Sequence, residues 1–318
     1  MRLSTLISLL GLCLAMTAND GLQAQDFRVT LLGTGDPTPS IERFGPSTLV
    51  EAGSEKLLFD VGRGATQRIL QLGMPLRDVT GVFLTHLHSD HIVGIPDLWL
   101  TGWLSPRFGG RMTAFRVWGP VGTEELMSGL ESAYQADIRI RIADQNYTPK
   151  GISIEAEEIS EGVVYERNGV RVTAFDVDHG DLIKPAMGYR VDYAGRSIVI
   201  SGDTRYSENL IRFATGTDLL IHEVAAVKAE LFSRSAGTRA IIDHHTTPEQ
   251  AGRVFNRVKP GLAVYSHITL VFDSTTAAPT LEDLESRTRT SYTGALQIGE
   301  DLMSFEIGNT VEVRRFTL

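Results

Sequence analysis

Short apolar runs bounded by glycine, proline or charged residues alternate with segments of helical spacing along most of the chain. Strands are predicted where β-branched and aromatic residues concentrate, at Phe27–Leu32, Ser47–Val50, Lys56–Asp60, Val79–Leu84, Phe115–Trp118, Val170–Asp176, Gly188–Tyr193, Ser197–Ser201, Leu219–His222 and Leu262–Ser266. Helices are predicted at Ala65–Leu72, Glu124–Tyr134 and Pro248–Val258, with a last strand-rich segment at Tyr292–Leu318. Because strands and helices interleave, we expect an α/β fold in which helices cover the sheets.

The first residues have the pattern of a secretory signal peptide. Arg2 precedes an almost wholly apolar run from Leu3 to Met16, and Leu22-Gln23-Ala24 follows a polar stretch. We therefore expect residues 1–24 to be removed, which leaves one domain, residues 25–318, in the periplasm or outside the cell. The run is shorter than the roughly 20 residues that span a bilayer, so no membrane attachment is expected after cleavage. An uncleaved anchor and a cleavage site a few residues away stay open as alternatives.

Charge and cysteine content narrow the chemistry. The chain has 318 residues and a formal net charge of -9. An acidic chain has little general attraction for nucleic acid, whose binding depends on basic side chains that displace counterions. The one cysteine, Cys13, lies in the predicted signal peptide, so histidine and carboxylate side chains must hold any metal in the mature chain.

The strongest chemical signal is the segment Thr85-His86-Leu87-His88-Ser89-Asp90-His91. In an extended segment, residues two apart point the same way, so His86 and His88 can bind one ion while the following turn presents Asp90 and His91 to a second. Two adjacent zinc ions can activate a bridging hydroxide for attack on an ester. The alternative is a charged, solvated loop.

This motif resembles the signature of the metallo-β-lactamase superfamily, and the resemblance implies a four-layer αββα sandwich. It also implies further ligands: His179 for the first metal, Asp203 as the bridging carboxylate and His267 for the second metal. The implied cofactor is a pair of Zn²⁺ ions, although manganese or iron suits the same nitrogen and oxygen ligands.

Two later motifs narrow the resemblance to ribonuclease Z and its arylsulfatase and phosphodiesterase relatives. His222-Glu223 closes a predicted strand, and His245 precedes a helix that begins with a capping box of Thr247 and Gln250. The resemblance implies that His245 assists the leaving group, with His244 as a rival for that role, while Asp90 orients the attacking hydroxide. His222 and Glu223 are expected to support the metal-bound groups from outside.

One departure from the ribonuclease Z pattern guides the functional prediction. Bacterial members usually carry a long arm that grips transfer RNA, whereas only a hairpin fits between His179 and Asp203 here. With the acidic charge and the predicted export, this favours a secreted binuclear zinc hydrolase of small anionic esters, aryl sulfates or phosphodiesters, with no nucleic acid partner. Trp99 and Trp103 could form an apolar wall for the substrate, with packing in the core as the alternative. Lys184, Arg190 and Arg205 could bind an anionic oxygen of the substrate, with placement on the surface as the alternative.

Three other functions stay open. The first is processing of the transfer RNA 3′ end, as in ribonuclease Z. The second is hydrolysis of a β-lactam, lactone or thioester on the same fold, and the third is a non-enzymatic binding protein, which the complete ligand set disfavours. The sequence does not determine the oligomeric state, and a homodimer is the one assembly that we include among the possible partners.

Overall fold

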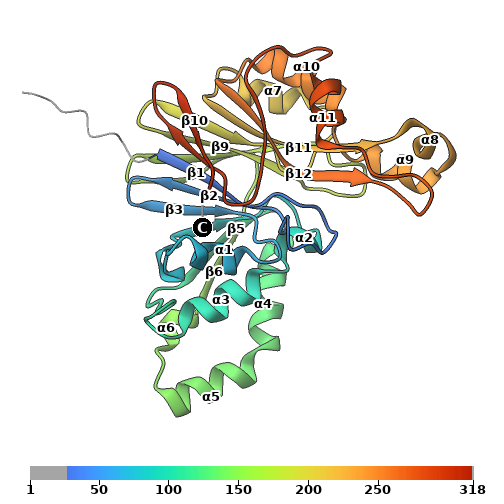
Figure 1. The fold of residues 1–318 in the computed structure, drawn as a ribbon. Helices are drawn as coiled ribbons and strands as arrows, with labels where there is room; N and C mark the ends of the chain where they lie inside the picture. The colour runs from blue at the N-terminus through green and yellow to red at the C-terminus, as the bar shows by residue number, and fades with distance from the viewer. Residues whose placement is uncertain (1–26, 317–318) are drawn as a thin grey trace, which may run out of the picture.

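Two β-sheets lie face to face in the computed structural model, which describes residues 27–316, and helices cover the outer face of each sheet (Figure 1). This confirms the expected four-layer αββα arrangement. The predicted signal peptide, residues 1–24, lies outside the described residues, so its cleavage and the cellular location stay predictions. None of the helices in residues 27–316 combines the length and apolarity needed to cross a membrane.

The first sheet has eight strands in the order β15-β14-β1-β2-β3-β4-β5-β6. Their bounds are β1 Phe27–Gly33, β2 Ser47–Ala52, β3 Glu55–Phe59, β4 Gly81–Phe83, β5 Phe115–Gly119, β6 Ile154–Glu158, β14 Ser304–Ile307 and β15 Val311–Arg314. Strands β3 to β6 run parallel, so residues that follow β3 and β4 emerge at the same edge of the sheet.

The second sheet has seven strands in the order β13-β12-β11-β10-β9-β8-β7. Their bounds are β7 Gly162–Arg167, β8 Val170–Asp176, β9 Met187–Tyr193, β10 Arg196–Ile200, β11 Leu219–Val227, β12 Leu262–Val271 and β13 Leu296–Ile298. Strands β10 to β13 are parallel, whereas β7 to β10 pair antiparallel.

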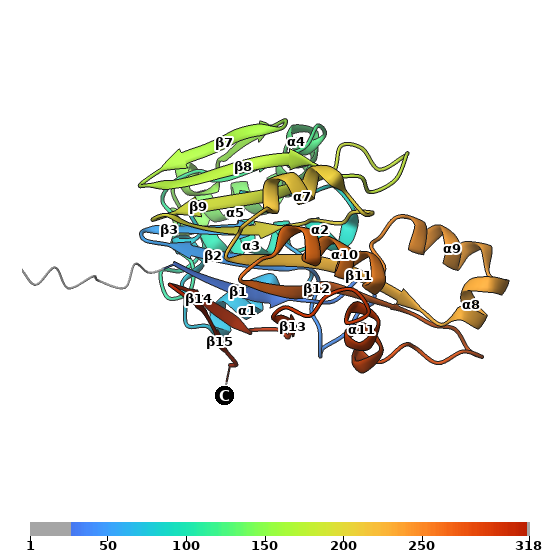
Figure 2. The ribbon, with the colours of Figure 1, turned by 90° about the horizontal axis from the view of Figure 1, so that it is seen from above.

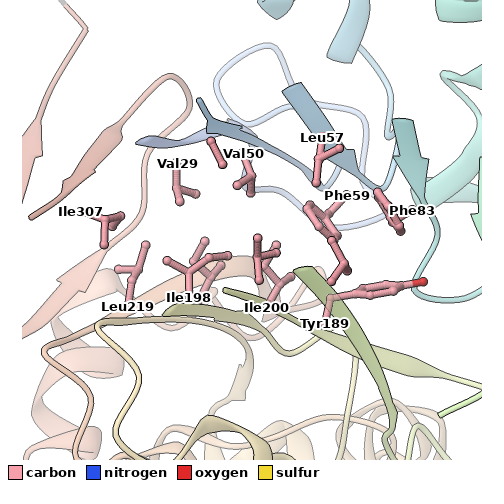
Figure 3. Close-up of a cluster of buried hydrophobic side chains, with 14 of the residues drawn as sticks. Val29, Val50, Leu57, Phe59, Phe83, Tyr189, Ile198, Ile200, Leu219 and Ile307 are labelled. Carbon is pink, nitrogen blue, oxygen red and sulfur yellow. The ribbon is translucent and has the colours of Figure 1, made fainter. Parts of the chain in front are cut away.

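Apolar side chains from the inner faces of both sheets interlock to form the central core. Figure 3 shows Val29, Leu57 and Phe59 of the first sheet pointing toward Tyr189 and Ile198 of the second. These side chains are buried, and burial of apolar surface is the main driving force for joining two sheets in this way.

Helices form the two outer layers. The outer side of the first sheet carries α1 Ala65–Gln71, the 3₁₀ turn η1 Leu76–Asp78, α2 Ser89–Ile92, α3 Ile95–Trp103, α4 Thr123–Ala133 and α6 Pro149–Ile152, and α5 Gln135–Gln145 lies beyond these helices, farther from the sheet (Figure 1). The second sheet is covered by α7 Glu208–Ala214, α10 Pro248–Val258 and α11 Leu281–Thr288. Two further helices, α8 Ala229–Arg234 and α9 Ala236–Asp243, project beyond the ends of β11 and β12 (Figure 2). The predicted capping box at Thr247 and Gln250 is confirmed, and it fixes the start of α10.

Several elements differ from the prediction. The prediction missed strands β6 and β7, which carry many charged residues, and all helices other than α1, α4 and α10. The C-terminal segment was expected to close one sheet, but β13 joins the second sheet while β14 and β15 join the first. Strands β11 and β12 also continue well past their predicted ends at His222 and Ser266.

Candidate metal centre

The motif after β4 places four polar side chains at the edge of the first sheet. His86 and His88 lie in the loop, and Asp90 and His91 lie on α2, a single helical turn that His88 precedes. His86, Asp90 and His91 are buried, whereas His88 is exposed. Because the chain changes from loop to helix after His88, His86 and His88 belong to one group of ligand atoms and Asp90 and His91 to another, as the spacing predicts.

The second sheet contributes three more side chains to the same place. His179 follows β8, Asp203 follows β10, and His267 lies within β12. Ligand atoms within 4.8 Å of one another define three groups, namely His86, His88, His179 and Asp203; Asp90, His91 and His267; and Asp203, His245 and His267. The structure therefore brings together all seven predicted metal ligands and adds His245 beside them.

Asp203 lies at the centre of this arrangement. Its Oδ2 is 3.8 Å from His86 Nε2, 3.6 Å from His179 Nε2, 3.4 Å from His91 Nε2 and 3.3 Å from His267 Nε2. One carboxylate oxygen thus faces imidazoles of both predicted ligand groups, which is the position that a bridging ligand requires.

Hydrogen bonds behind the histidines orient their rings. Asp60 Oδ2 lies 2.7 Å from His91 Nδ1, and His244 O lies 2.9 Å from His179 Nδ1. Because a carboxylate and a carbonyl oxygen only accept hydrogen bonds, each Nδ1 donates, which leaves each Nε2 to face the cluster. Outer partners of this kind fix the tautomer of metal-binding histidines.

The charge balance of the cluster suits a cation. Burial holds the pKa of His86 well below its ordinary value and lowers the pKa of His179 to about 4, so both rings are neutral and ready to bind a metal. Burial disfavours the ionised form of Asp203, yet His267 and His91 keep its pKa well below the ordinary value. Moreover, His91 Nε2 and Asp203 Oδ1 are buried without a hydrogen-bond partner among the described residues. Such orphaned atoms are costly unless an ion satisfies them, so this donor set fits a divalent metal.

His245 is held at the rim of the cluster by Glu223. Its ring lies 5.0 Å from that of His179, and its Nδ1 lies 3.2 Å from Glu223 Oε2. The other carboxylate oxygen, Oε1, accepts a 2.7 Å hydrogen bond from the backbone N–H of Thr246. Burial opposes protonation, but the Glu223 carboxylate raises the pKa of His245 to about 9. The structure thus assigns Glu223 the role of supporting His245.

His222 does not share the supporting position of Glu223. Its Nδ1 lies 2.6 Å from the carbonyl oxygen of Glu223, and its ring packs 5.6 Å from that of Phe255 on α10. The pairing of β11 with β12 shifts register between His222 and Val224, and His267 on β12 has a positive φ of 44°. Irregularities within a strand change the direction in which its side chains point. Glu223 and His267 therefore face the site although they lie inside β11 and β12, which the sequence predicted to end near these residues.

The expected substrate wall and anion-binding cations lie elsewhere. Trp99 and Trp103 are fully buried, and their Nε1–H groups donate to the carbonyl oxygens of Ile152 and Thr148, both at 2.9 Å. These tryptophans are therefore core residues, because helical spacing turned them toward the sheet.

Of the three predicted cations, Arg190 pairs with Asp192 and Phe213 O, while Arg205 donates to Asp243 O. Lys184 is exposed. The residues that line the cleft at the metal-ligand cluster, within the described part of the chain, include no lysine or arginine.

Asp60 is a site residue that the sequence reasoning missed. It emerges at the end of β3, beside the parallel strand β4, and accepts hydrogen bonds from the backbone N–H and the hydroxyl of Thr85, both at 2.8 Å. A carboxylate directly after an apolar strand, as in Leu57-Leu58-Phe59-Asp60, was the signal that could have revealed it.

Comparison with known proteins places this geometry in a family. A sequence profile described as a β-lactamase superfamily domain matches residues 55–268. Ribonuclease Z of Mycolicibacterium gilvum (strain PYR-GCK) is 34% identical over 286 residues, covering 88% of this chain and 96% of that protein. The metallo-β-lactamase fold protein YhfI of Bacillus subtilis has a TM-score of 0.67 at 20% identity, covering 88% of this chain and 98% of its own. The short form of human tRNase Z has a TM-score of 0.63 at 22% identity, covering 87% and 98%.

These relatives contradict two predictions. The prediction of a small-ester hydrolase of the arylsulfatase type is wrong, and so is the exclusion of a nucleic acid partner, because curated relatives that match along almost their full length are named ribonuclease Z. The net charge of -9 was a poor guide, since it averages over the whole surface, whereas a metal centre acts locally. The hairpin expected between His179 and Asp203 is present as β9 and β10, joined at Ala194-Gly195, so its shortness does not decide the function.

The profile covers more than half of the chain, and the fold and the donor set agree with it. The chain therefore belongs to the β-lactamase superfamily of metal-dependent hydrolases, and its curated relatives within that superfamily are ribonuclease Z proteins.

Proposed function

We propose that this protein is an RNA phosphodiesterase of the ribonuclease Z type, which removes the 3′ extension of precursor transfer RNA. The observation that carries the proposal is the cluster around Asp203, in which histidines from both sheets face one carboxylate oxygen. The 34% identity to a ribonuclease Z over 88% of the chain supports RNA as the substrate.

Two zinc ions are the metals that we propose for this centre. His86, His88 and His179 would hold one ion, Asp90, His91 and His267 would hold the other, and Asp203 would contact both. Zinc suits this set because imidazole nitrogens dominate it and thiolates are absent. When bound, the pair supplies Lewis-acid polarisation of the phosphoryl group and lowers the pKa of the attacking water.

Two side chains are proposed to act on the reacting atoms. The carboxylate of Asp90, whose Oδ2 lies 3.3 Å from His267 Nε2, would accept a hydrogen bond from the attacking water and orient it. His245 would donate the proton of its Nε2 to the leaving oxygen, because Glu223 binds its Nδ1 and stabilises the imidazolium. Glu223 is a positioning residue in this scheme.

Cleavage of a precursor transfer RNA by the zinc-loaded full-length chain tests the proposal. We expect one cut at the start of the 3′ extension, mapped by sequencing the product end, and loss of that cut in Asp203→Ala. Asp192→Ala is the matched control, since Asp192 pairs with Arg190 away from the site. Turnover of an aryl phosphodiester with no cleavage of the precursor would contradict the proposal.

A further inference from the structure

The cleft that contains the metal-ligand cluster also has an apolar wall. It encloses about 460 Å³ and is lined by His88, Asp90, Asp203 and His245 together with residues of α9 and the end of β12. Those residues are Ile241 on α9 and Thr269, Leu270, Val271 and Phe272 on β12 and just beyond it. None of them is explained by the metal centre.

Two features distinguish this wall from the rest of the cleft. Phe272 is 61% exposed and Ile241 is 43% exposed, although large apolar side chains usually avoid water. Thr269 is only 8% exposed, and its Oγ1 is buried without a hydrogen-bond partner among the described residues. Two exposed apolar side chains thus line the same cleft as a threonine whose buried hydroxyl has no partner among the described residues.

The turn that carries Phe272 is anchored rather than loose. Arg234 on α8 forms a 2.7 Å ion pair with Oδ2 of Asp273, the next residue after Phe272. Oδ1 of Asp273 accepts hydrogen bonds from the backbone N–H groups of Thr275, at 2.9 Å, and Thr276, at 2.8 Å. Arg234 of the projecting helix α8 (Figure 2) therefore anchors the turn that carries Phe272, and an anchored turn favours binding because less entropy is lost when a ligand stacks there.

We propose that Phe272, Ile241 and Thr269 form a subsite for the unpaired base of the nucleoside that carries the leaving oxygen. The inference rests on the proposed function and names a substrate contact within it. A base offers a flat π-face for Phe272 and hydrogen-bonding edges for Thr269, whereas a second phosphate would favour lysine or arginine, which the described lining residues do not include. The subsite belongs to the leaving-group side because Ile241 lies one helical turn before His245, the proton donor.

Paired RNA substrates test this subsite in the zinc-loaded chain. One is a precursor transfer RNA, and the other is identical but abasic at the nucleotide that carries the leaving oxygen. For Phe272→Ala we expect kcat/KM on the first RNA to fall roughly 5- to 150-fold, the equivalent of about 1–3 kcal/mol for stacking one base, with no change on the abasic RNA. Phe272→Trp keeps a ring and should retain the wild-type preference, and Thr269→Val should cost roughly 2- to 12-fold on the first RNA only.

A binding measurement gives a readout that is independent of cleavage. The same RNA, with 2-aminopurine at that nucleotide and a non-cleavable linkage at the scissile position, is titrated into the zinc-loaded protein, and stacking should quench its fluorescence in the wild type but not in Phe272→Ala. Phe232→Ala is the matched control, because Phe232 on α8 is also exposed but does not line this cleft.

The outcomes separate the two proposals. Equal effects of Phe272→Ala on both RNAs, or equal quenching in wild type and variant, would overturn the subsite while leaving ribonuclease activity intact. If wild-type protein cleaves neither RNA, the proposed function fails, and the quenching result alone decides the subsite.

Discussion

Substitution of Asp60 by asparagine tests how the metal ligands are oriented. The Asp60 carboxylate is buried and accepts hydrogen bonds from Thr85 N, Thr85 Oγ1 and His91 Nδ1 at 2.8, 2.8 and 2.7 Å. In Asp60→Asn, the amide oxygen can still accept the Thr85 N–H, but the NH₂ group then faces His91 Nδ1. His91 would have to accept that hydrogen bond, which moves its proton to Nε2, the atom that faces Asp203.

The expected cost falls mainly on metal affinity. Loss of an outer partner typically weakens metal binding about 10- to 100-fold, equivalent to about 1.4–2.8 kcal/mol. The displaced Thr85 hydroxyl adds about 1–3 kcal/mol of lost fold stability if it is left without an acceptor. Competition with a chromophoric chelator gives the zinc affinity, and urea unfolding of the metal-free protein gives the stability term separately.

Asp218→Asn is the matched control for this experiment. Asp218 also accepts a backbone hydrogen bond, from Ser197 N at 2.8 Å, but it lies outside the metal-ligand cluster. We expect this variant to lose some stability and no zinc affinity. If Asp60→Asn bound zinc as tightly as the wild type while losing stability like Asp218→Asn, the tautomer argument would be refuted.

Four further results are expected. His245→Ala should lower kcat by about 10²- to 10⁴-fold on RNA but much less on a nitrophenyl ester, whose leaving oxygen needs no proton, so comparing the two substrates checks its role. Glu223 raises the pKa of His245 from 6.5 to about 9, so their pairing stabilises the metal-free fold fully below about pH 6.5. This contribution is lost as the pH rises through about 9. In Glu223→Gln, the NMR titration of His245 should move to lower pH. Trp99→Ala should destabilise the fold by about 3–5 kcal/mol in urea unfolding, consistent with a core residue, and an unchanged midpoint would contradict its burial. Removal of the metal by a chelator should abolish activity and lower the melting temperature, because a metal ion at about 1,000 times its Kd stabilises the fold by about 4 kcal/mol. An unchanged melting temperature would argue against a tightly held metal.

The metal-ligand cluster could be predicted because its signals are local. His86 to His91 form one short motif, and His179 and Asp203 directly follow strands whose apolar patterns are clear. His179, Asp203 and His267 were assigned from the family resemblance that the motif suggested, and the structure brings them together because ends of neighbouring strands converge.

Asp60, Glu223 and the wall at Phe272 depend on tertiary contacts that no local pattern reveals. Asp60 meets His91 only because β3 and β4 pair in parallel. Glu223 and His267 face the site through irregular backbone inside β11 and β12, while an unbroken apolar pattern predicted regular strands that stop there. Phe272 lines the cleft through a turn that Arg234 of α8 anchors, a contact between segments far apart in the sequence.

The substrate could not be read from overall charge. In the proposed function, the positive charge that an RNA phosphate meets would come from bound metal and from an imidazolium at His245, neither of which the formal charge counts. The pattern of apolar and polar residues predicted an α/β fold and the family resemblance implied its four layers, but the identity of the bond that is cleaved depends on a few side chains at one edge.

The most direct test of the account compares kcat/KM of the zinc-loaded chain on three substrates: a precursor transfer RNA, an unstructured RNA with the same 3′ extension, and bis(p-nitrophenyl) phosphate. We predict the highest value for the precursor, with a single cut at the start of the extension that Asp203→Ala abolishes. Efficient turnover of the aryl ester with no preference for, or no cleavage of, the precursor would contradict the central claim.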